Sequence, residues 1–147
     1  MCILRINIKE STMLILGIES SCDETGLALY SEDHGLIAHL VNSQIDLFTE
    51  YGGVIPEIAA RDHSAKIIGI LKQLLKQTNH KLNDIDLIAY TAGPGLIGSL
   101  MIGETVAKTI ANVLNIELLP INHLEGHILA PGLEEDGLEP PYLCLLV

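Results

Sequence analysis

Two histidines near the end of the sequence have the spacing of a metal-binding pair. His123 and His127 lie four residues apart, after Asn122, a residue typical of helix N-caps, and before Pro131, a residue that ends helices. Positions four apart on an α-helix point in nearly the same direction, because each residue turns by about 100°. Two imidazoles on one helix face can bind a cation together, although two unrelated histidines also fit this spacing.

The glutamate between these histidines differs in position from the glutamate of the zinc-peptidase motif His-Glu-x-x-His. In that motif the glutamate directly follows the first histidine and reaches the metal-bound water. Glu125 comes one position later, about 200° round a helix from His123, so it faces largely away from a shared cation. We therefore interpret Glu125 as a supporting or structural residue and disfavour a metallopeptidase mechanism. A third ligand has to come from elsewhere, either from Asp62 and His63 or from residues beyond Val147.

A polar turn near the start of the sequence is the second stretch whose residue types could bind a ligand or take part in catalysis. Three hydroxyl side chains (Ser20, Ser21 and Thr25) and two carboxylates (Asp23 and Glu24) follow a predicted apolar strand. Backbone amides in such a turn can approach phosphate oxygens, and the carboxylates can hold a magnesium-bound phosphate or orient a water. The same composition is also typical of ordinary turns.

A glycine-rich turn over residues 91–99 connects a predicted strand to a predicted helix. This layout resembles a phosphate-binding loop at a helix N-terminus. It is neither a Walker loop nor a dinucleotide fingerprint, because no Gly-Lys-Ser/Thr follows and Gly-x-Gly-x-x-Gly is absent. Gly98 and Gly103 equally allow the helix to pack closely on a sheet, and the sequence leaves both interpretations open.

Composition and charge limit the class of protein. The 147 residues are 48% hydrophobic and only 3% aromatic, which predicts one aliphatic core. The net charge of −11 argues against direct binding of a nucleic-acid backbone by this chain alone. Three scattered cysteines indicate a reducing compartment, and the sequence contains neither a secretory signal nor an apolar run of the ~18 residues that span a membrane. We therefore expect a cytoplasmic protein without a membrane partner.

Hydrophobic periodicity predicts a mixed sheet covered by helices. Strands are expected at residues 14–19, 27–30, 36–41, 85–90, 116–121 and 142–147, and helices at 56–78, at 98–114 and around the two histidines. Residues 48–54 are interpreted as a loop, residues 1–12 as an N-terminal extension and residues 13–147 as the folded unit. Because the last predicted strand is apolar and nothing follows it, we expect an interrupted protein.

The predicted helix at 56–78 is apolar over a wide surface. Its stripe consists of Ile58, Ala59, Ala65, Ile68, Leu71, Leu74 and Leu75. Ile67 and Ile70 widen the stripe beyond what one core face requires. We interpret the helix as packed on two sides, with a protein partner on the second side.

Four motifs in this order resemble those of one family. They are Gly17–Thr25 (Gly-Ile-Glu-Ser-Ser-Cys-Asp-Glu-Thr), Gly52–Arg61, Gly93–Leu100 and Asn122–His127. Together they resemble the universal tRNA threonylcarbamoyladenosine transferase family, formerly known as O-sialoglycoprotein endopeptidases. Four collinear motifs are far more specific than one, and they extend the resemblance from Met13 to the end of the chain.

The resemblance implies an α/β fold of the actin/Hsp70/sugar-kinase type. In that fold each of two related lobes has a ribonuclease-H-like mixed sheet with flanking helices, and this chain matches the first lobe. The implied activity is transfer of a threonylcarbamoyl group from its adenylate to N6 of adenosine 37, in tRNAs that read codons beginning with A. The implied metal, usually described as iron (Fe2+), is bound by His123, His127 and an aspartate of the second lobe. A nucleotide, either threonylcarbamoyl-adenylate or ATP, is expected between the lobes.

The resemblance also assigns roles to the two turns. Asp23 and Glu24 match positions near the cleft, where acid–base or orienting roles are expected, and the sequence does not divide these roles between them. Contacts to the nucleotide are expected at Ser20, Ser21, Thr25 and Gly95. The metal would polarise the donor carbonyl, since a neutral exocyclic amine is a poor nucleophile.

The sequence departs from the family pattern at its end. Family members continue after the strand matched by residues 143–147 with a Ser-Gly-Gly-His-Thr loop and a second lobe, and residues 1–12 have no family counterpart. We therefore expect this chain to be inactive alone and to bind metal weakly. The bacterial members of this family work with a paralogous non-catalytic subunit and an ATPase, and tRNA binding is expected of the full complex. A metallopeptidase and a non-catalytic, partner-binding remnant remain the alternatives.

Overall fold

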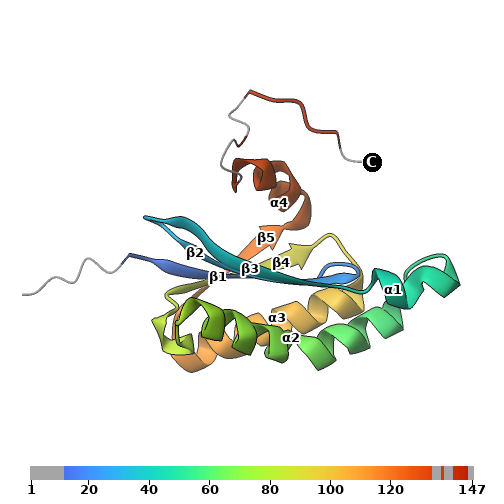
Figure 1. Cartoon of the computed structure of the whole chain (residues 1–147), viewed down its shortest axis with the longest axis horizontal. Coiled ribbons are helices and arrows are strands. Elements are labelled where there is room, and N and C mark those ends of the chain that lie inside the picture. The colour runs from blue at the N-terminus through green and yellow to red at the C-terminus, as the bar shows by residue number, and fades with distance from the viewer. Residues whose placement is uncertain (1–11, 134–136, 138–140, 146–147) are drawn as a thin grey trace, which may run out of the picture.

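The fold is built on one five-stranded mixed sheet. The computed structural model describes residues 12–133, 137 and 141–145, and its strands lie in the order β3-β2-β1-β4-β5 (Figure 1). Antiparallel pairs join β1 to β2 and β2 to β3, whereas β4 runs parallel to β1 and β5 runs parallel to β4. The strands are β1 (Leu14–Glu19), β2 (Glu24–Ser31), β3 (Gly35–Ser43), β4 (Leu87–Gly93) and β5 (Glu117–Asn122).

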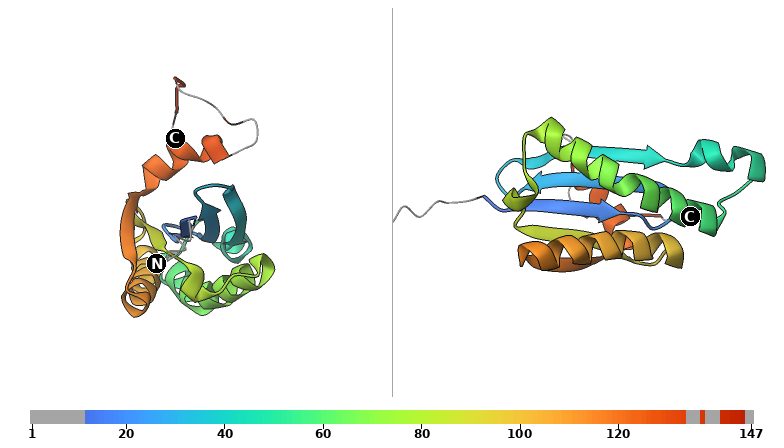
Figure 2. Two further views of the ribbon diagram at one scale, coloured as in Figure 1. Left: turned by 90° about the vertical axis from the view of Figure 1, so that its left-hand side faces the viewer. Right: turned by 90° about the horizontal axis from the view of Figure 1, so that it is seen from below.

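Two long helices cover one face of this sheet. They lie beside each other beneath the strands, while the short histidine helix lies on the opposite side (Figures 1 and 2). The α-helices are α1 (Ile45–Phe48), α2 (Pro56–Thr78), α3 (Ile97–Leu114) and α4 (His123–Leu129). Short 3-10 turns occupy Thr49–Tyr51, Leu82–Asp84 and Ala130–Leu133. None of the helices in the described ranges is long and apolar enough to cross a membrane.

The hydrophobic core lies between the sheet and the two long helices. Alternate residues of a strand point to opposite faces, so β1 directs Leu14, Leu16 and Ile18 toward the helices and directs Gly17 and Glu19 to the other face. Aliphatic side chains fill this layer, as the composition predicts; the innermost, each at most 2% exposed, include Leu16, Leu27, Leu29, Leu74 and Ile88. The α/β fold class and the order of the main elements are confirmed.

Several element boundaries differ from those predicted, and one strand contains a proline. β2 begins at Glu24, so Glu24 and Thr25 belong to a strand and not to the preceding turn. The expected loop over residues 48–54 instead contains the end of α1 and a 3-10 turn. β5 is an edge strand and contains Pro120, which has no N–H to donate; proline is tolerated in sheets mainly at such edges.

The strand expected at residues 142–147 is wrong for the part that the structure describes. Residues 141–145 form no strand, and Leu143 is 99% exposed. An apolar sequence becomes a strand only where a neighbour satisfies its backbone hydrogen bonds. Here α4 directs the chain away from the sheet, and the hydroxyl of Tyr142 donates to the carbonyl of Ile128 instead. The predicted extension at residues 1–12 lies outside the described residues, except for Thr12.

The buried residues of α2 contradict the interpretation that Ile67 and Ile70 widen its apolar stripe in order to contact a protein partner. Its buried residues are Ala59, His63, Ile67, Leu71 and Leu74, a spacing of three or four that follows one helix face. Ile67 is only 1% exposed and Ile70 is partly buried against the core, so neither is free for a partner. α2 packs on β2, β3 and α3 together, which explains a stripe wider than one contact requires. Ile68, at 45% exposed, is the residue that faces outward.

Neighbouring isoleucines of α2 offer a direct test of this orientation. Ile67→Ala should reduce the free energy of unfolding by about 2–5 kcal/mol, because it leaves a cavity in the core. Ile68→Ala should change it by no more than about 0.5 kcal/mol, because the side chain is half exposed. Urea unfolding followed by circular dichroism measures both values, and equal losses would contradict the assigned core face.

Candidate functional site

Three chain turns meet at one edge of the sheet. β1, β4 and β5 are parallel, so their carboxyl ends lie together, which is where open α/β sheets usually carry their sites. The polar turn follows β1, the glycine-rich turn follows β4 and the histidine helix follows β5. The amide of Leu96 donates to the carbonyl of Ser21 (2.7 Å), and Ser21 Oγ lies 3.2 Å from His123 Nδ1. The structure therefore brings together all three stretches that the sequence singled out.

The two histidines of α4 face each other, with the Nε2 atom of one ring directed at the Nε2 atom of the other. Asn122 caps the helix, since its side chain accepts a hydrogen bond from the amide of Leu124 (2.9 Å). The Nε2 atoms of His123 and His127 are 3.0 Å apart, and the rings meet edge to face. Such an approach arises when one nitrogen donates to the other or when both face one cation. Nitrogens bound to one ion at about 2.0–2.1 Å are about 2.8–3.4 Å apart for ligand angles near 90–109°. The pair therefore fits a single metal ion.

A carboxylate that the sequence analysis missed lies behind the first histidine. Glu19, the last residue of β1, places Oε2 3.4 Å from His123 Nδ1. The hydroxyl of Thr91 donates to the same oxygen, and the amide of Ser21 donates to Oε1 (2.5 Å). A carboxylate that accepts from Nδ1–H leaves Nε2 free as a ligand, as is common for metal-binding histidines. The available signal was alternation along β1, which puts Glu19 on the face opposite the core.

Hydrogen bonding keeps Glu19 in its charged form. Partial burial acts to raise the pKa of this carboxyl, but hydrogen bonds from Ser21 and Thr91, with His123 nearby, outweigh burial and lower the pKa below its ordinary value. A carboxylate that stays ionised can stabilise a protonated Nδ1 at His123. Glu19 is therefore suited to orient the histidine pair.

The hydroxyl groups of the polar turn point in different directions. Ser20 and Thr25 are 2% and 0% exposed, and their hydroxyls are bonded inside the protein, to the carbonyl of Ser99 (2.9 Å) and to His63 Nδ1 (2.7 Å). Ser21 differs, because its hydroxyl reaches His123. The expected nucleotide contacts at these three residues stay predictions, and the side chain of Ser21 is the one that already reaches the candidate metal pair.

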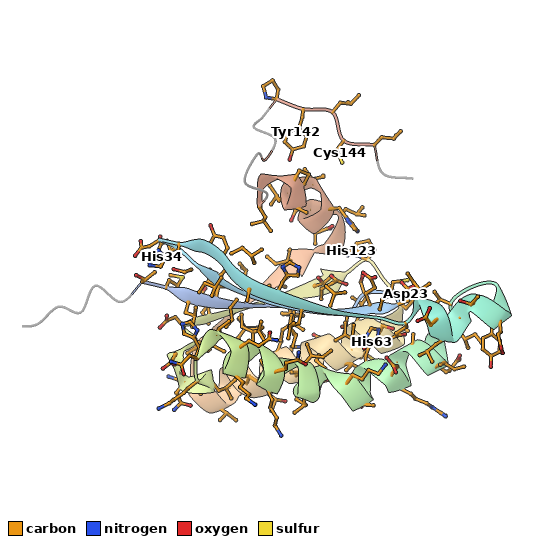
Figure 3. All side chains as sticks on the ribbon, in the orientation of Figure 1. Asp23, His34, His63, His123, Tyr142 and Cys144 are labelled. Carbon is orange, nitrogen blue, oxygen red and sulfur yellow. The ribbon has the colours of Figure 1, made fainter. Side chains whose placement is uncertain are left out.

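The predicted carboxylates differ in their surroundings. Asp23 is half-buried in the turn, whereas Glu24 is exposed at the start of β2. Figure 3 shows Asp23 at the end of the sheet, between His123 on one side and His63 on the helix side. Glu125 is exposed on α4. The catalytic roles of Asp23 and Glu24 remain predictions.

The expectation that Asp62 or His63 completes the metal site is wrong. Both ring nitrogens of His63 are engaged inside the protein, with Thr25 and with the carbonyl of Cys22, and Asp62 pairs with Lys66 (2.8 Å). Within residues 12–133, 137 and 141–145, no three His, Cys, Asp or Glu side chains are placed to hold one metal ion. These residues supply two nitrogen ligands and the carboxylate that supports one of them.

The glycines near the site allow the turns to touch. A Cβ at Gly95 would lie 2.6 Å from the carbonyl oxygen of Ser21, and one at Gly103 would lie 2.4 Å from Ser20 Oγ. At Gly98 the added carbon would lie 3.2 Å from Cβ of Ala60. Close packing is thus a sufficient reason for these glycines. The expected nucleotide contact at Gly95 stays a prediction.

A hollow of about 520 Å³ lies on the sheet face opposite the long helices, beneath α4. Small residues of β1, β2 and β4 leave this space open: Gly17, Gly26, Ala28 and Ala89. Glu19, Glu24, His123 and His127 also line it, near the carboxyl end of β1. Its volume lies within the range of ligand pockets, about 300–1,000 Å³. The candidate metal pair therefore opens onto a space large enough for a small substrate.

These features define a class and then a family. Five mixed strands in this order, with the long helices on one face, form a ribonuclease-H-like lobe of the actin type. The TsaD model, described as tRNA N6-adenosine threonylcarbamoyltransferase, matches residues 35–147. The chain belongs to this family.

Solved structures support the fold. The chain is similar to YeaZ from Pseudomonas aeruginosa, with 18% identity and a TM-score of 0.59, over 75% of this chain and 43% of that chain. It is also similar to an uncharacterized protein resembling peptidase YEAZ, from the same organism, with 23% identity and a TM-score of 0.55, over the same shares of each chain. The chain thus spans less than half the length of these relatives.

The lowered pKa of Glu19 predicts a specific acid response. A group with a depressed folded pKa stabilises the protein above its unfolded pKa, and this contribution is lost as pH falls through the folded pKa. Above pH 4.5 the wild type should therefore be more stable than Glu19→Gln, and the difference should shrink as pH falls below 4.5. Chemical unfolding at several pH values measures this, with Glu125→Gln as an exposed control on α4. A constant difference across the range would contradict the assignment.

Two glycines of the long helices form a matched test of close packing. Gly103→Ala should destabilise the protein by about 1–3 kcal/mol, because its Cβ would meet Ser20 Oγ at the site. Gly69→Ala has no atom within 4 Å of the added carbon and should stabilise α2 by up to about 1 kcal/mol. Thermal unfolding distinguishes the two, and a gain at both positions would refute tight packing of α3 on the turn.

Proposed function

We propose that this chain is the first lobe of an enzyme that transfers a threonylcarbamoyl group from its adenylate to N6 of adenosine 37 in tRNAs reading codons that begin with A. The observation that carries this proposal is the 3.0 Å approach of the two Nε2 atoms of His123 and His127. Membership of the transferase family supports it, as does the hollow beside the pair. The reaction is proposed to take place in the cytoplasm.

The proposed metal is a single divalent cation, Fe2+, held by His123 and His127. When bound, it would supply Lewis-acid polarisation of the donor carbonyl. Glu19, 3.4 Å from His123 Nδ1, and Ser21, 3.2 Å from it, are proposed to hold the ring so that Nε2 is directed at the ion. The third protein ligand, an aspartate, is proposed to come from a second lobe.

The carboxylates of the polar turn are proposed to handle the proton of the attacking amine. When N6 of adenosine bonds to the carbonyl carbon, it becomes cationic and has to lose a proton, and the bond from that carbon to the phosphate oxygen of the adenylate breaks, so that AMP leaves with the electron pair. Glu24 lines the hollow and is exposed, so it is the better placed of the two to accept that proton. Asp23 is proposed to orient the nucleotide of the donor, together with Ser21 and the glycine-rich turn at Gly95.

The tRNA and the partner proteins belong to the assembled enzyme. The net charge of −11 opposes direct binding of tRNA by this lobe, so the phosphate contacts are proposed to come from a second lobe and from partner subunits. A paralogous lobe is proposed to pack on α2 and α3, where Ile68 and Met101 are 45% and 55% exposed near a groove between the helices. An ATPase is proposed as the further subunit.

Metal affinity separates the roles of the site residues. His123→Ala and His127→Ala should each abolish measurable Fe2+ binding, because each removes one of two nitrogen ligands. Glu19→Gln should weaken Fe2+ binding by about 10–100-fold, as expected when a supporting carboxylate is lost. Calorimetric titration under anaerobic conditions measures these affinities.

Glu125→Gln is the matched control for the metal experiment, since Glu125 lies on α4 but is exposed. It should leave Fe2+ affinity unchanged. Retained binding in both histidine variants would refute the metal site. Metal binding that depends on the histidines, without any transfer to tRNA by the assembled enzyme, would refute the proposed reaction while leaving the site intact.

The proposed partner surface predicts a localised effect of charge. Ile68→Asp combined with Met101→Asp should abolish co-purification with the paralogous subunit, because two carboxylates would be buried in an apolar contact. Val113→Asp is the control, since Val113 is 75% exposed near the far end of α3. Unchanged co-purification of the double variant would exclude this face as the interface.

A further inference from the structure

A layer of buried polar side chains supports the polar turn from the helix side. His63 of α2, Ser99 of α3 and Thr25 of β2 are each 0% exposed, and Gln44 is 1% exposed. Buried polar groups are costly unless they are hydrogen-bonded, so such a layer demands a specific arrangement of partners. Two of these side chains, His63 and Ser99, bond to the backbone carbonyl of Cys22 in the turn, and Thr25 bonds to His63. The side-chain amide of Gln44 donates to the carbonyl of Ala59, and its Oε1 has no partner among the described residues.

Three consecutive carbonyl oxygens of the turn are held from inside. The carbonyl of Ser21 accepts from the amide of Leu96 (2.7 Å), and that of Asp23 accepts from the amide of Gln44 (3.0 Å). The carbonyl of Cys22, between them, accepts from His63 Nε2 (3.0 Å) and from Ser99 Oγ (3.2 Å). The central carbonyl is therefore fixed by side chains, and the other two by backbone amides.

The hydrogen bonds determine the tautomer of His63. A carbonyl oxygen can only accept, so Nε2 must carry the proton. Nδ1 faces the hydroxyl of Thr25 at 2.7 Å and the side-chain amide of Gln44 at 3.4 Å, both of which can donate to it. His63 thus donates through Nε2 and accepts through Nδ1, and it connects β2, through Thr25, to the carbonyl at the centre of the turn.

We propose that His63 is a positioning residue that fixes the turn from Ser21 to Asp23, and thereby places the Asp23 carboxylate and the Ser21 hydroxyl relative to His123. The ring is too deep to touch a substrate, so it acts only through Cys22 and Thr25. The importance of Asp23 rests on the proposed function. The placement of the turn by His63 does not, and it can be measured without any reaction.

Cys22 provides a built-in reporter of the turn. Its thiol is exposed, and partial burial together with contact to Asp23 raises its pKa above the ordinary value. Alkylating reagents react with the thiolate, so the raised pKa slows the reaction at neutral pH. If the turn loosens, the thiol separates from Asp23 and the reaction accelerates. Cys144, which is also exposed, serves as an internal reference in the same sample.

Two conservative substitutions distinguish the contribution of Nε2 of His63 from that of Nδ1. The side-chain amide of glutamine can reach the place of Nε2 and donate to Cys22, whereas the shorter asparagine reaches only the place of Nδ1. His63→Asn should therefore raise the iodoacetamide rate of Cys22 several-fold relative to Cys144, measured by peptide mass spectrometry. His63→Gln should return the rate close to that of the wild type. A folded His63→Asn protein with an unchanged Cys22 rate would overturn the proposal.

The tautomer is tested in the wild-type chain, which guards against a variant that fails to fold. Nitrogen-15 NMR of the His63 ring should show a protonated Nε2 and an unprotonated Nδ1. A doubly protonated ring, or a proton on Nδ1 alone, would overturn the proposal whatever the variants do.

Assays of the assembled enzyme separate this proposal from the proposed function. His63→Asn should lower kcat for transfer by a larger factor than it lowers Fe2+ affinity, since His63 reaches the histidine pair of α4 only indirectly, through Ser21. Loss of Fe2+ affinity in parallel with kcat would indicate general disruption and would count against a positioning role. If the wild-type complex transfers nothing, the proposed function fails, and the thiol and NMR results still decide the role of His63.

Discussion

Parallel pairing of β1 with β4 and of β4 with β5 is the constraint on which the rest of the structure depends. Parallel strands need a crossover, and α2 and α3 provide both crossovers on the same face of the sheet. The three carboxyl ends then share one edge, so segments separated by up to about a hundred residues in the chain become neighbours. Ser21 and His123 are in contact for this reason, and no local sequence feature would join them.

The end of the sheet where these three strands terminate combines very close contacts at glycines with a layer of buried polar side chains. The turn before α3 approaches the backbone of Ser21 closely at Gly95, and α3 approaches the side chain of Ser20 closely at Gly103, so that a larger residue does not fit at either position. Beneath the turn, however, the contacts are polar and include side chains such as His63, Ser99 and Thr25. An apolar layer there would leave the turn carbonyls without donors. The cost of burying polar groups is thus offset by fixing a turn that an apolar core could not orient.

Much of the fold was predictable because the signals are local. An apolar run followed by a polar turn located β1, and the 3.6-residue period together with Pro56 located α2 within its observed bounds. The spacing of His123 and His127 likewise predicted a shared direction, which the facing Nε2 atoms confirm. The expected strand at the end of the chain failed because strand formation depends on a neighbour, and sequence alone does not show whether one is within reach.

What sequence reasoning missed depends on contacts between distant segments. Glu19 looks like the polar end of a strand until β4 and α4 bring Thr91 and His123 to it. His63 looks like a candidate ligand until burial engages both of its nitrogens. Ile67 and Ile68 are chemically identical neighbours, and only the packing of α2 on two partners decides which one is core. In each case the residue type is compatible with more than one role or degree of burial, and only the tertiary structure shows which one applies.

Pro120 has a consequence for how this sheet can associate with other chains. β5 forms one edge of the sheet, and an exposed strand edge is a template on which another strand can add through backbone hydrogen bonds. A strand that approached β5 would find no amide donor at Pro120, in the middle of the strand, and its ladder would be interrupted there. Growth by strand addition is thereby discouraged at the edge that leads into the histidine helix. A single residue that takes no part in the chemistry of the candidate site thus removes one backbone donor from the strand that leads into it.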